Sequence, residues 1–378
     1  MSASLSIQPV DDAAALARFI QFPYDHYRAD PNWVPPLRMD RKDSLSPKHP
    51  LFQHVQWQGF LALRGGEVVG RISAQIDDRY PTLGVEGLGQ FGMLDAVDDA
   101  EVYAGLLEAA EGWLKAKGCT RAEGPFSLGV NQELGLLVDG FDTPPFFLMA
   151  HGPRWAAKHV EAAGYDLAQT LLAYQVHCEF DAPRAMTRML ERAGNVRFRP
   201  IDPKRAEDEF RAMCGVFNDA WSNNWRFVPF GEEELIAIGK EMLLVTKPDL
   251  IQIAEIDGEP VAFGVMLPNI NEAIADLDGR LLPFGWAKLL WRMKVKHPST
   301  GRVPLMGVRK AHQAGRLGAA LAFGVIEGMR RPAAQVGMGM IELSWILEDN
   351  LPMRHMLEAI GGHVTKRYHM YGRDLPAS

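Results

Sequence analysis

Hydrophobic residues along this chain recur with two spacings. One is the spacing of about 3.6 residues typical of an amphipathic helix, and the other is the alternation at every second residue typical of a strand. In the first half, helical spacing marks residues 11–20 and 102–117. Strand-like runs at 59–63 and 68–76 flank a Gly-Gly turn and predict a hairpin, and later runs at 119–123 and 171–180 predict further strands. A proline-rich stretch at 22–37 argues against a long helix there.

The second half repeats this order of elements. Two helices are predicted at 206–221 and 232–245, followed by a hairpin at 250–267 around an Asp-Gly turn. A strand at 302–308, an amphipathic helix at 317–330 and an alternating strand at 341–347 complete the pattern. The repeated order predicts two copies of one α/β unit, with the boundary between residues 181 and 196.

Composition narrows the class of protein. The chain has 378 residues, of which 47% are apolar, enough for two folded cores. A net charge of -7 argues against nucleic acid as the main partner. The absence of a basic, apolar start and of a long apolar run predicts a cytoplasmic protein.

Metal and disulfide chemistry find no support in the sequence. The three cysteines lie far apart, and an odd number without close pairs fits neither a disulfide framework nor a zinc site. His26, His54, His312 and His355 have no spacing typical of metal ligands. We therefore expect no metal.

The most informative stretch lies between the predicted strand that ends at Val308 and the following helix. The loop contains Gln313, Gly315 and Gly318, and the helix begins at once. Free backbone N–H groups and the helix dipole at such a start attract a pyrophosphate, and glycines allow close approach. An ordinary helix cap would show the same pattern, so this alternative stays open.

This loop resembles the pyrophosphate loop of the GCN5-related N-acetyltransferase (GNAT) superfamily, Gln/Arg-x-x-Gly-x-Gly/Ala. Gln313 and Gly318 match, and Arg316 stands where the family usually has glycine. Asn350 and the Gly361-Gly362 pair resemble the next helix of the family, although the tyrosine common on that helix is missing. The likeness is firm for residues 250–371.

The resemblance implies two tandem GNAT-like domains, each a mixed, mostly antiparallel sheet flanked by helices. Residues 1–185 are expected to form a degenerate domain and residues 186–378 an acyltransferase domain. It also implies an acyl-CoA site. Its expected members are Met306, Gly307, Val308, Gln313, Ala314, Gly315, Arg316, Leu317, Gly318, Ala319 and Asn350.

The acceptor side is predicted from residue type and position. Direct attack of an amine on a thioester needs a proton acceptor, for which Glu348 is the candidate, with a solvated loop carboxylate as the alternative. Asn350 and Tyr368 are further catalytic candidates. The loop after the first helix of the second half could line the acceptor pocket or only pack, through Trp221, Asn223, Asn224 and Trp225.

A basic, tryptophan-containing stretch begins at Leu281 and ends at Pro298. Such stretches lie well at membrane surfaces, whereas an ordinary half-buried helix is the simpler interpretation. Through its segments Phe22–Leu37, Asn218–Trp225 and Trp345–Arg354, the whole chain also resembles long bacterial GNAT proteins that include bacterial ceramide synthases, which implies a lipid amine as acceptor.

Three functions remain open from the sequence. The first is an acyl-CoA-dependent N-acyltransferase acting on a lipid amine such as a sphingoid base. The second is an N-acetyltransferase of a small molecule or protein. The third is a non-catalytic acyl-CoA-binding protein, which the Arg316 substitution and the missing tyrosine favour slightly.

Overall fold

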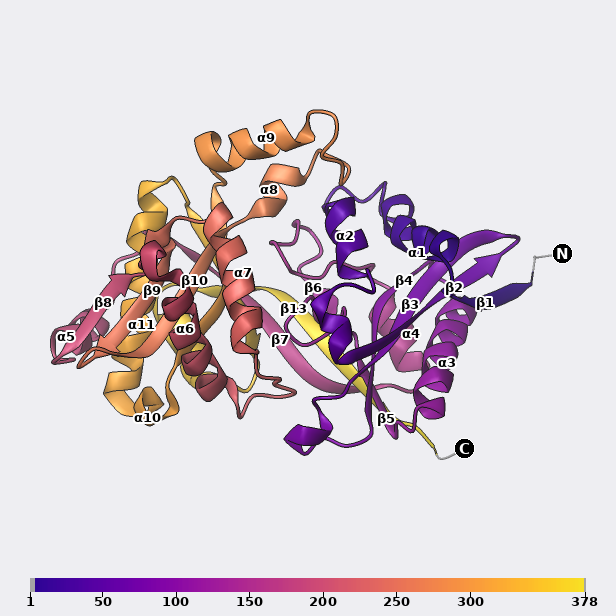
Figure 1. The fold of residues 1–378 in the computed structure, drawn as a ribbon, viewed down its shortest axis with the longest axis horizontal. Coiled ribbons are helices and arrows are strands. Elements are labelled where there is room, and N and C mark those ends of the chain that lie inside the picture. The colour runs from indigo at the N-terminus through magenta and orange to yellow at the C-terminus, as the bar shows by residue number, and fades with distance from the viewer. Residues whose placement is uncertain (1–3, 377–378) are drawn as a thin grey trace. The chain divides into compact units, whose positions relative to one another are not determined.

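The computed structural model describes residues 4–376, which divide into two compact units (Figure 1). Unit 1 comprises the chain up to Leu171 together with Ile274–Trp286 and the chain from Lys366 onward. Unit 2 comprises Leu172–Ala273 and Ala287–Thr365. Each unit therefore contains segments that are far apart in sequence.

Unit 1 is a twisted sheet with helices on both faces. Its strand order is β1-β2-β3-β4-β5-β13, with β6 paired to β13. The elements are β1 (Leu5–Pro9), α1 (Ala13–His26), α2 (Arg38–Ser44), β2 (Val55–Arg64), β3 (Glu67–Asp77), β4 (Leu88–Ala96), α3 (Ala100–Ala116), β5 (Arg121–Gly124), β6 (Leu136–Asp139) and α4 (Ala156–Ala162).

Alternation along β2 explains the two layers of unit 1. Phe60 and Ala62 pack in one hydrophobic cluster with the helix α3, while Leu61 and Leu63 pack in another cluster with Phe19 of α1. Successive side chains of a strand point to opposite faces, so β2 contributes to both cores.

Unit 2 has the strand order β7-β12-β11-β10-β9-β8. Its elements are α5 (Arg184–Glu191), β8 (Val196–Pro200), α6 (Ala206–Trp221), α7 (Glu232–Val245), β9 (Ile251–Ile256), β10 (Glu259–Pro268), α8 (Ile270–Ile274), α9 (Gly285–Trp291), β11 (Thr300–Val308), α10 (Lys310–Gln313), α11 (Gly315–Gln335), β12 (Met340–Leu347) and α12 (Leu351–Ala359). Short 3-10 turns occupy Pro50–Gln53, Pro81–Leu83, Pro203–Arg205 and Pro248–Leu250, and Arg292–Lys296 is a π-helical turn.

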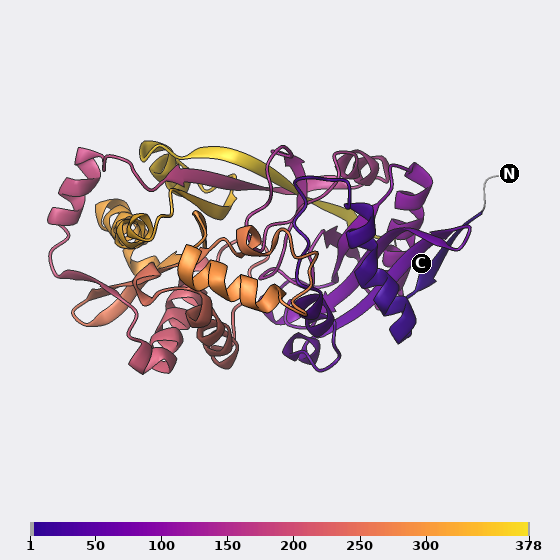
Figure 2. The same cartoon turned by 90° about the horizontal axis from the view of Figure 1, so that it is seen from above.

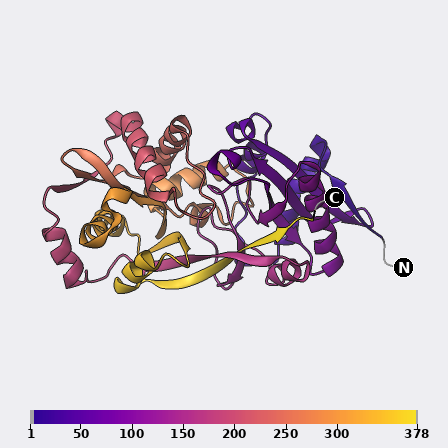
Figure 3. The same ribbon diagram turned by 90° about the horizontal axis from the view of Figure 1, so that it is seen from below.

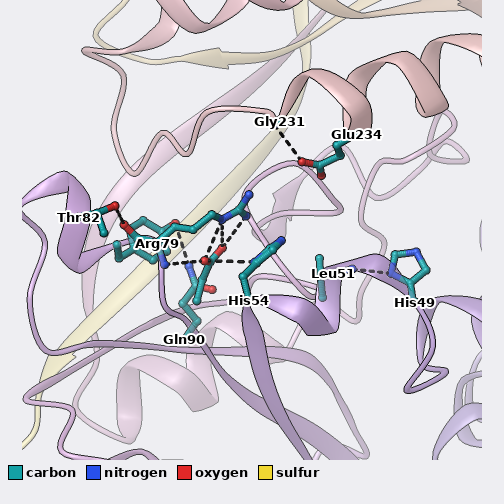
Figure 4. Close-up of polar contacts among 10 residues, drawn as sticks. His49, Leu51, His54, Arg79, Thr82, Gln90, Gly231 and Glu234 are labelled. Atoms are coloured by element: carbon teal, nitrogen blue, oxygen red, sulfur yellow. Dashed lines mark hydrogen bonds and ion pairs between the residues drawn. The ribbon is translucent and has the colours of Figure 1, made fainter.

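Helices α6 and α11 cover opposite faces of the unit 2 sheet. Leu321 and Val325 of α11 lie in the main core cluster with Ile341 of β12. On the other face, the ring of Phe217 in α6 lies 6.5 Å from that of Phe263 in β10. The following helix α7 begins with a capping contact, in which the Gly231 N–H donates to the Glu234 carboxylate (Figure 4).

Two long strands have residues in both units. They are β7 (Asp166–His177) and β13 (His363–Asp374), which are neighbours in the sheet and lie side by side in Figure 3. The predicted α/β fold of helix-flanked, mostly antiparallel sheets is confirmed. The predicted division into two domains, residues 1–185 and 186–378, stays a prediction. The compact units are defined by contacts within the fold, whereas the predicted domains are two copies of one α/β unit.

One local prediction was wrong. Helix α1 continues through Pro23 to His26, although the proline-rich stretch was expected to be irregular from residue 22. The buried residues Phe19, Ile20 and Tyr24 anchor this helix in its core, and such tertiary packing outweighs the low helix propensity of proline.

Candidate functional site

The site in unit 2 begins where two parallel strands separate. Strands β11 and β12 pair only over Thr300–Val303 and Met340–Leu343, yet they continue to Val308 and Leu347. A register shift against β10, between Val265 and Leu267, lies at the same level. We call this place, where β11 and β12 cease to pair beside the bulge, the fork.

Helix α11 begins next to the end of β11 with an exposed, uncapped first turn. Residues 313–316 are exposed, and no side chain accepts a hydrogen bond at the N-cap, Ala314. The first backbone N–H groups of this helix are therefore available to an anion, and the dipole adds positive charge. Arg309, Lys310 and Arg316 lie within the same short stretch of sequence.

Two glycines give this turn its shape. Gly315 has φ of +70°, a conformation that L side chains adopt only with strain. A Cβ on Gly318 would lie 2.1 Å from the carbonyl oxygen of Gln313 and 2.7 Å from that of His312. Only glycine lets the helix approach the preceding loop this closely.

The loop is tied to the end of α6. The Gln313 side-chain amide donates to the Val308 carbonyl at 2.8 Å and to the Ala220 carbonyl at 3.2 Å. The Lys310 ammonium donates to Asn223 Oδ1 at 2.8 Å. The sequence-predicted cofactor residues and one predicted acceptor residue thus lie together.

Trp221 makes packing contacts, one of the two alternatives left open by the sequence. Its indole N–H donates to the Met306 carbonyl at 2.8 Å, and its ring stacks on Phe217. Trp221 therefore holds β11 beside the fork. The other predicted acceptor residues, Asn224 and Trp225, lie half-buried in the connection from α6 to α7.

Asn350 begins helix α12 as predicted. Its side-chain oxygen accepts from the Met353 N–H at 3.3 Å, and Gly361, with φ of +86°, follows the helix. Glu348 is half-buried at the end of β12, and its backbone carbonyl accepts from Arg354 at 2.7 Å. Tyr368 lies on the part of β13 that belongs to unit 1, with a fully buried side chain.

A buried polar cluster at the base of the fork was missed by the sequence analysis. Arg302 Nε donates to Ser344 Oγ at 2.9 Å, and Ser344 Oγ donates to Glu342 at 2.8 Å. All three side chains are at most 3% exposed. The Arg302 guanidinium also lies 4.6 Å from the ring centroid of Trp345. This cluster links the last paired residues of β11 and β12.

Comparison with known proteins agrees with this architecture. A protein of Caulobacter vibrioides named bacterial ceramide synthase is 47% identical over 379 residues, which cover 99% of this chain and 98% of that protein. Protein YghO of Escherichia coli is 46% identical over 362 residues, covering 95% of this chain and 93% of that protein. This chain belongs to the bacterial ceramide synthase family. No family model matches the chain.

Solved structures place the bacterial ceramide synthase family among proteins with the GNAT fold. A tandem GNAT protein from the clavulanic acid biosynthesis pathway has a TM-score of 0.57 at 13% identity, covering 99% of this chain and 100% of that one. A GCN5-related N-acetyltransferase from Sphaerobacter thermophilus has a TM-score of 0.55 at 13% identity, covering 99% and 97%. The predicted GNAT fold is confirmed.

In unit 1 of this bacterial ceramide synthase family member, helix α3 and strands β4 and β5 correspond to helix α11 and strands β11 and β12 of unit 2. Their helix start and strand ends differ from those of unit 2. The carboxylate of Asp99 caps α3 and accepts from the Glu101 and Val102 N–H groups. Between β4 and β5, the Phe126 N–H donates to the Phe91 carbonyl at 2.7 Å. The Asp99 side chain, paired with Arg64 at 2.5 Å, occupies the helix start, and a backbone hydrogen bond joins β4 to the segment after β5, so we expect this unit not to bind a pyrophosphate.

One group of three side chains in the described part of the chain has metal-ligand geometry. His54, Asp77 and Asp78 have ligand atoms within 4.8 Å of one another. Arg79 already binds the Asp77 carboxylate through two nitrogens, as drawn around Arg79 and His54 in Figure 4. Since a guanidinium neutralises this carboxylate, the arrangement gives no reason to add a metal, and its predicted absence stays a prediction.

Proposed function

We propose that this protein is an acyl-CoA-dependent N-acyltransferase that transfers a long-chain acyl group to a lipid amine such as a sphingoid base. The observation that carries the proposal is the exposed, uncapped start of α11 beside the fork of β11 and β12. The name of the Caulobacter relative supports the lipid amine as acceptor.

The residues around the start of α11 would each contact a different part of acyl-CoA. The free N–H groups of the first turn, from Ala314 to Leu317, would donate to the pyrophosphate, with Gly318 and Ala319 in close contact behind them, and Arg316 would add a positive charge. The strand edge at Met306, Gly307 and Val308 would lie along the arm of the substrate, because β12 no longer pairs with it, while the Met306 and Val308 carbonyls also accept from Trp221 and Gln313. Gln313 and Ala314 shape the loop, and Asn350 orients the facing helix.

The reaction forms one bond and breaks another. The neutral amine nitrogen attacks the thioester carbonyl carbon, forms the C–N bond, and expels the CoA thiolate as the C–S bond breaks. The amine loses a proton, for which Glu348 is the proposed acceptor, and the thiolate gains one. A backbone N–H in the fork would stabilise the oxyanion. Asn350 and Tyr368 stay predictions as catalytic groups.

The acceptor is proposed to approach along the α6–α7 connection, with Asn223, Asn224 and Trp225 at its path and Trp221 supporting it. A lipid amine has to be taken from a membrane, so we place the protein at the cytoplasmic face of the inner membrane. Peripheral contact through residues 281–298 would serve this purpose.

Mass spectrometry of products tests the function. Purified protein is supplied with acyl-CoAs of graded length and a panel of amines that includes sphingoid bases. Gly318→Trp is the binding-deficient control. The expected product is a long-chain amide of a sphingoid base, formed only by the wild type. Products from acetyl-CoA alone would favour a small-molecule N-acetyltransferase, and CoA binding without any product would favour a non-catalytic protein.

A further inference from the structure

Exposed apolar side chains are concentrated in one short segment. Of the eleven exposed large hydrophobic side chains in the described part of the chain, six lie between residues 282 and 295. Exposed apolar side chains concentrated in one segment, unlike single ones scattered over a surface, usually mark an interaction site. The six are Leu282 (80% exposed), Phe284 (78%), Trp286 (51%), Leu290 (53%), Trp291 (54%) and Val295 (65%).

The segment is folded and not a loose loop. The Trp286 N–H donates to the Leu281 carbonyl at 2.8 Å, and its indole N–H donates to the Pro283 carbonyl at 3.1 Å. Helix α9 follows and continues into the π-helical turn. Figures 1 and 2 show α9, in orange, as a separate helix outside the unit 2 sheet. The apolar side chains are thus presented on ordered backbone.

Both ends of the segment are anchored. In unit 1, the Arg38 N–H donates to the Gly279 carbonyl at 2.9 Å. In unit 2, Arg292 donates to the Ala273 carbonyl at 2.8 Å and Lys294 donates to the Leu244 carbonyl at 2.7 Å. These contacts fix the backbone on both sides of the segment.

The positive charge of this segment favours an anionic partner. The stretch from residue 280 to 297 contains five Lys and Arg residues and no Asp or Glu, in a chain of net charge -7. The cations Lys288, Arg292, Lys294 and Lys296 alternate with the exposed apolar residues. Cationic side chains interleaved with Trp, Phe and Leu suit the headgroup and upper acyl region of an anionic bilayer.

We propose that residues 281–297 dock the protein on an anionic phospholipid bilayer, with Leu282, Phe284, Trp286, Leu290 and Trp291 entering the interface. The segment lies on the surface and does not span it, because no helix of residues 4–376 is long and apolar enough to cross a membrane. Its use, collection of a lipid amine, rests on the proposed function, whereas the docking itself does not.

Co-sedimentation with vesicles tests the docking on the full chain. Wild-type protein is mixed with phosphatidylcholine vesicles and with vesicles of phosphatidylcholine and phosphatidylglycerol. The expected partition coefficient is at least tenfold higher for the anionic vesicles. Phe284→Ser combined with Trp291→Ser should lower it at least tenfold. Lys288→Glu combined with Lys296→Glu should remove the preference for anionic lipid.

Leu167→Ser is the matched control, because Leu167 is 54% exposed and lies outside the segment. It should bind vesicles as the wild type does. Quenching of tryptophan fluorescence by brominated lipid gives a second readout on the wild type alone. Equal, weak partition into both vesicle types without quenching would overturn the proposal, as would an equal loss in the control.

Analytical ultracentrifugation tests whether the partner of this segment is a second copy of the chain and not a bilayer. Self-association that the Phe284→Ser, Trp291→Ser variant abolishes would identify a second copy of the chain as the partner and overturn membrane docking. The assay needs no acyl-CoA. Vesicle binding without any acylated product would therefore refute the proposed function alone, and product formation without vesicle binding would refute the docking alone.

Discussion

Replacement of Gly318 by alanine tests the phosphate site most directly. The added Cβ would lie 2.1 Å from the Gln313 carbonyl oxygen and 2.5 Å from the carbonyl carbon. Both are backbone atoms, so no side-chain rotation relieves the contact. The loop and the helix start have to separate by about 1 Å, which moves the N–H groups that are proposed to hold the pyrophosphate.

The expected loss follows from this displacement. Overpacking of this kind costs about 1–3 kcal/mol of folding free energy. A hydrogen bond to a charged group contributes about 1.5–3 kcal/mol, and the displacement weakens one or two of them. At about 1.4 kcal/mol for each factor of ten, the affinity for CoA should fall about 10- to 100-fold.

Isothermal titration of CoA into wild type and variant measures this affinity. Gly328→Ala is the control in the same helix, because its Cβ would meet side-chain atoms of Gln252, the nearest at 2.8 Å, and no backbone atom among its three nearest neighbours. The control should bind CoA within about twofold of wild type. A Gly318→Ala variant with wild-type affinity would show that the diphosphate does not rest on this helix start.

Three further outcomes are expected. Glu348→Gln should slow turnover at least tenfold with CoA affinity unchanged, since general base catalysis contributes about 100-fold or more, and a wild-type rate would exclude Glu348 as proton acceptor. Glu342→Gln should lower the free energy of unfolding, measured in urea, by about 3 kcal/mol, because it removes the carboxylate that compensates the buried Arg302 charge. An unchanged midpoint of the urea transition would contradict this. Burial raises the pKa of the Cys178 thiol to about 11, so iodoacetamide should label Cys178 in native protein only slowly at pH 8, and rapid labelling there would refute its burial.

Local sequence patterns were sufficient for most of unit 2. Helices α6 and α7 begin and end at the residues predicted, and the hairpin of β9 and β10 has its turn at Asp257 and Gly258. These elements are determined by periodicity and turn chemistry within a few residues. The start of α11 lies two residues earlier than predicted, because Gly315 supplies the turn that admits the helix.

Long-range features could not be predicted in the same way. Arg302 lies within a run that looks apolar, and its burial depends on Ser344, some forty residues away. The strand β6 and its pairing with β13 were missed, since Leu136–Asp139 lies within a loop-like stretch rich in Gly and Pro. A single sequence contains no signal that two such distant segments pair.

The contribution of β13 to unit 1 has a consequence for the synthesis of the protein. In unit 1, Tyr371 and Arg373 of β13 pair with Gly124 and Ala122 of β5, so the last strand of the chain completes the first unit. The ribosome makes β13 only after it has made the segments of unit 2. The β5 edge of the amino-terminal sheet therefore stays open until β13 has been made, and a deletion of β13 should unfold the half of the protein made first.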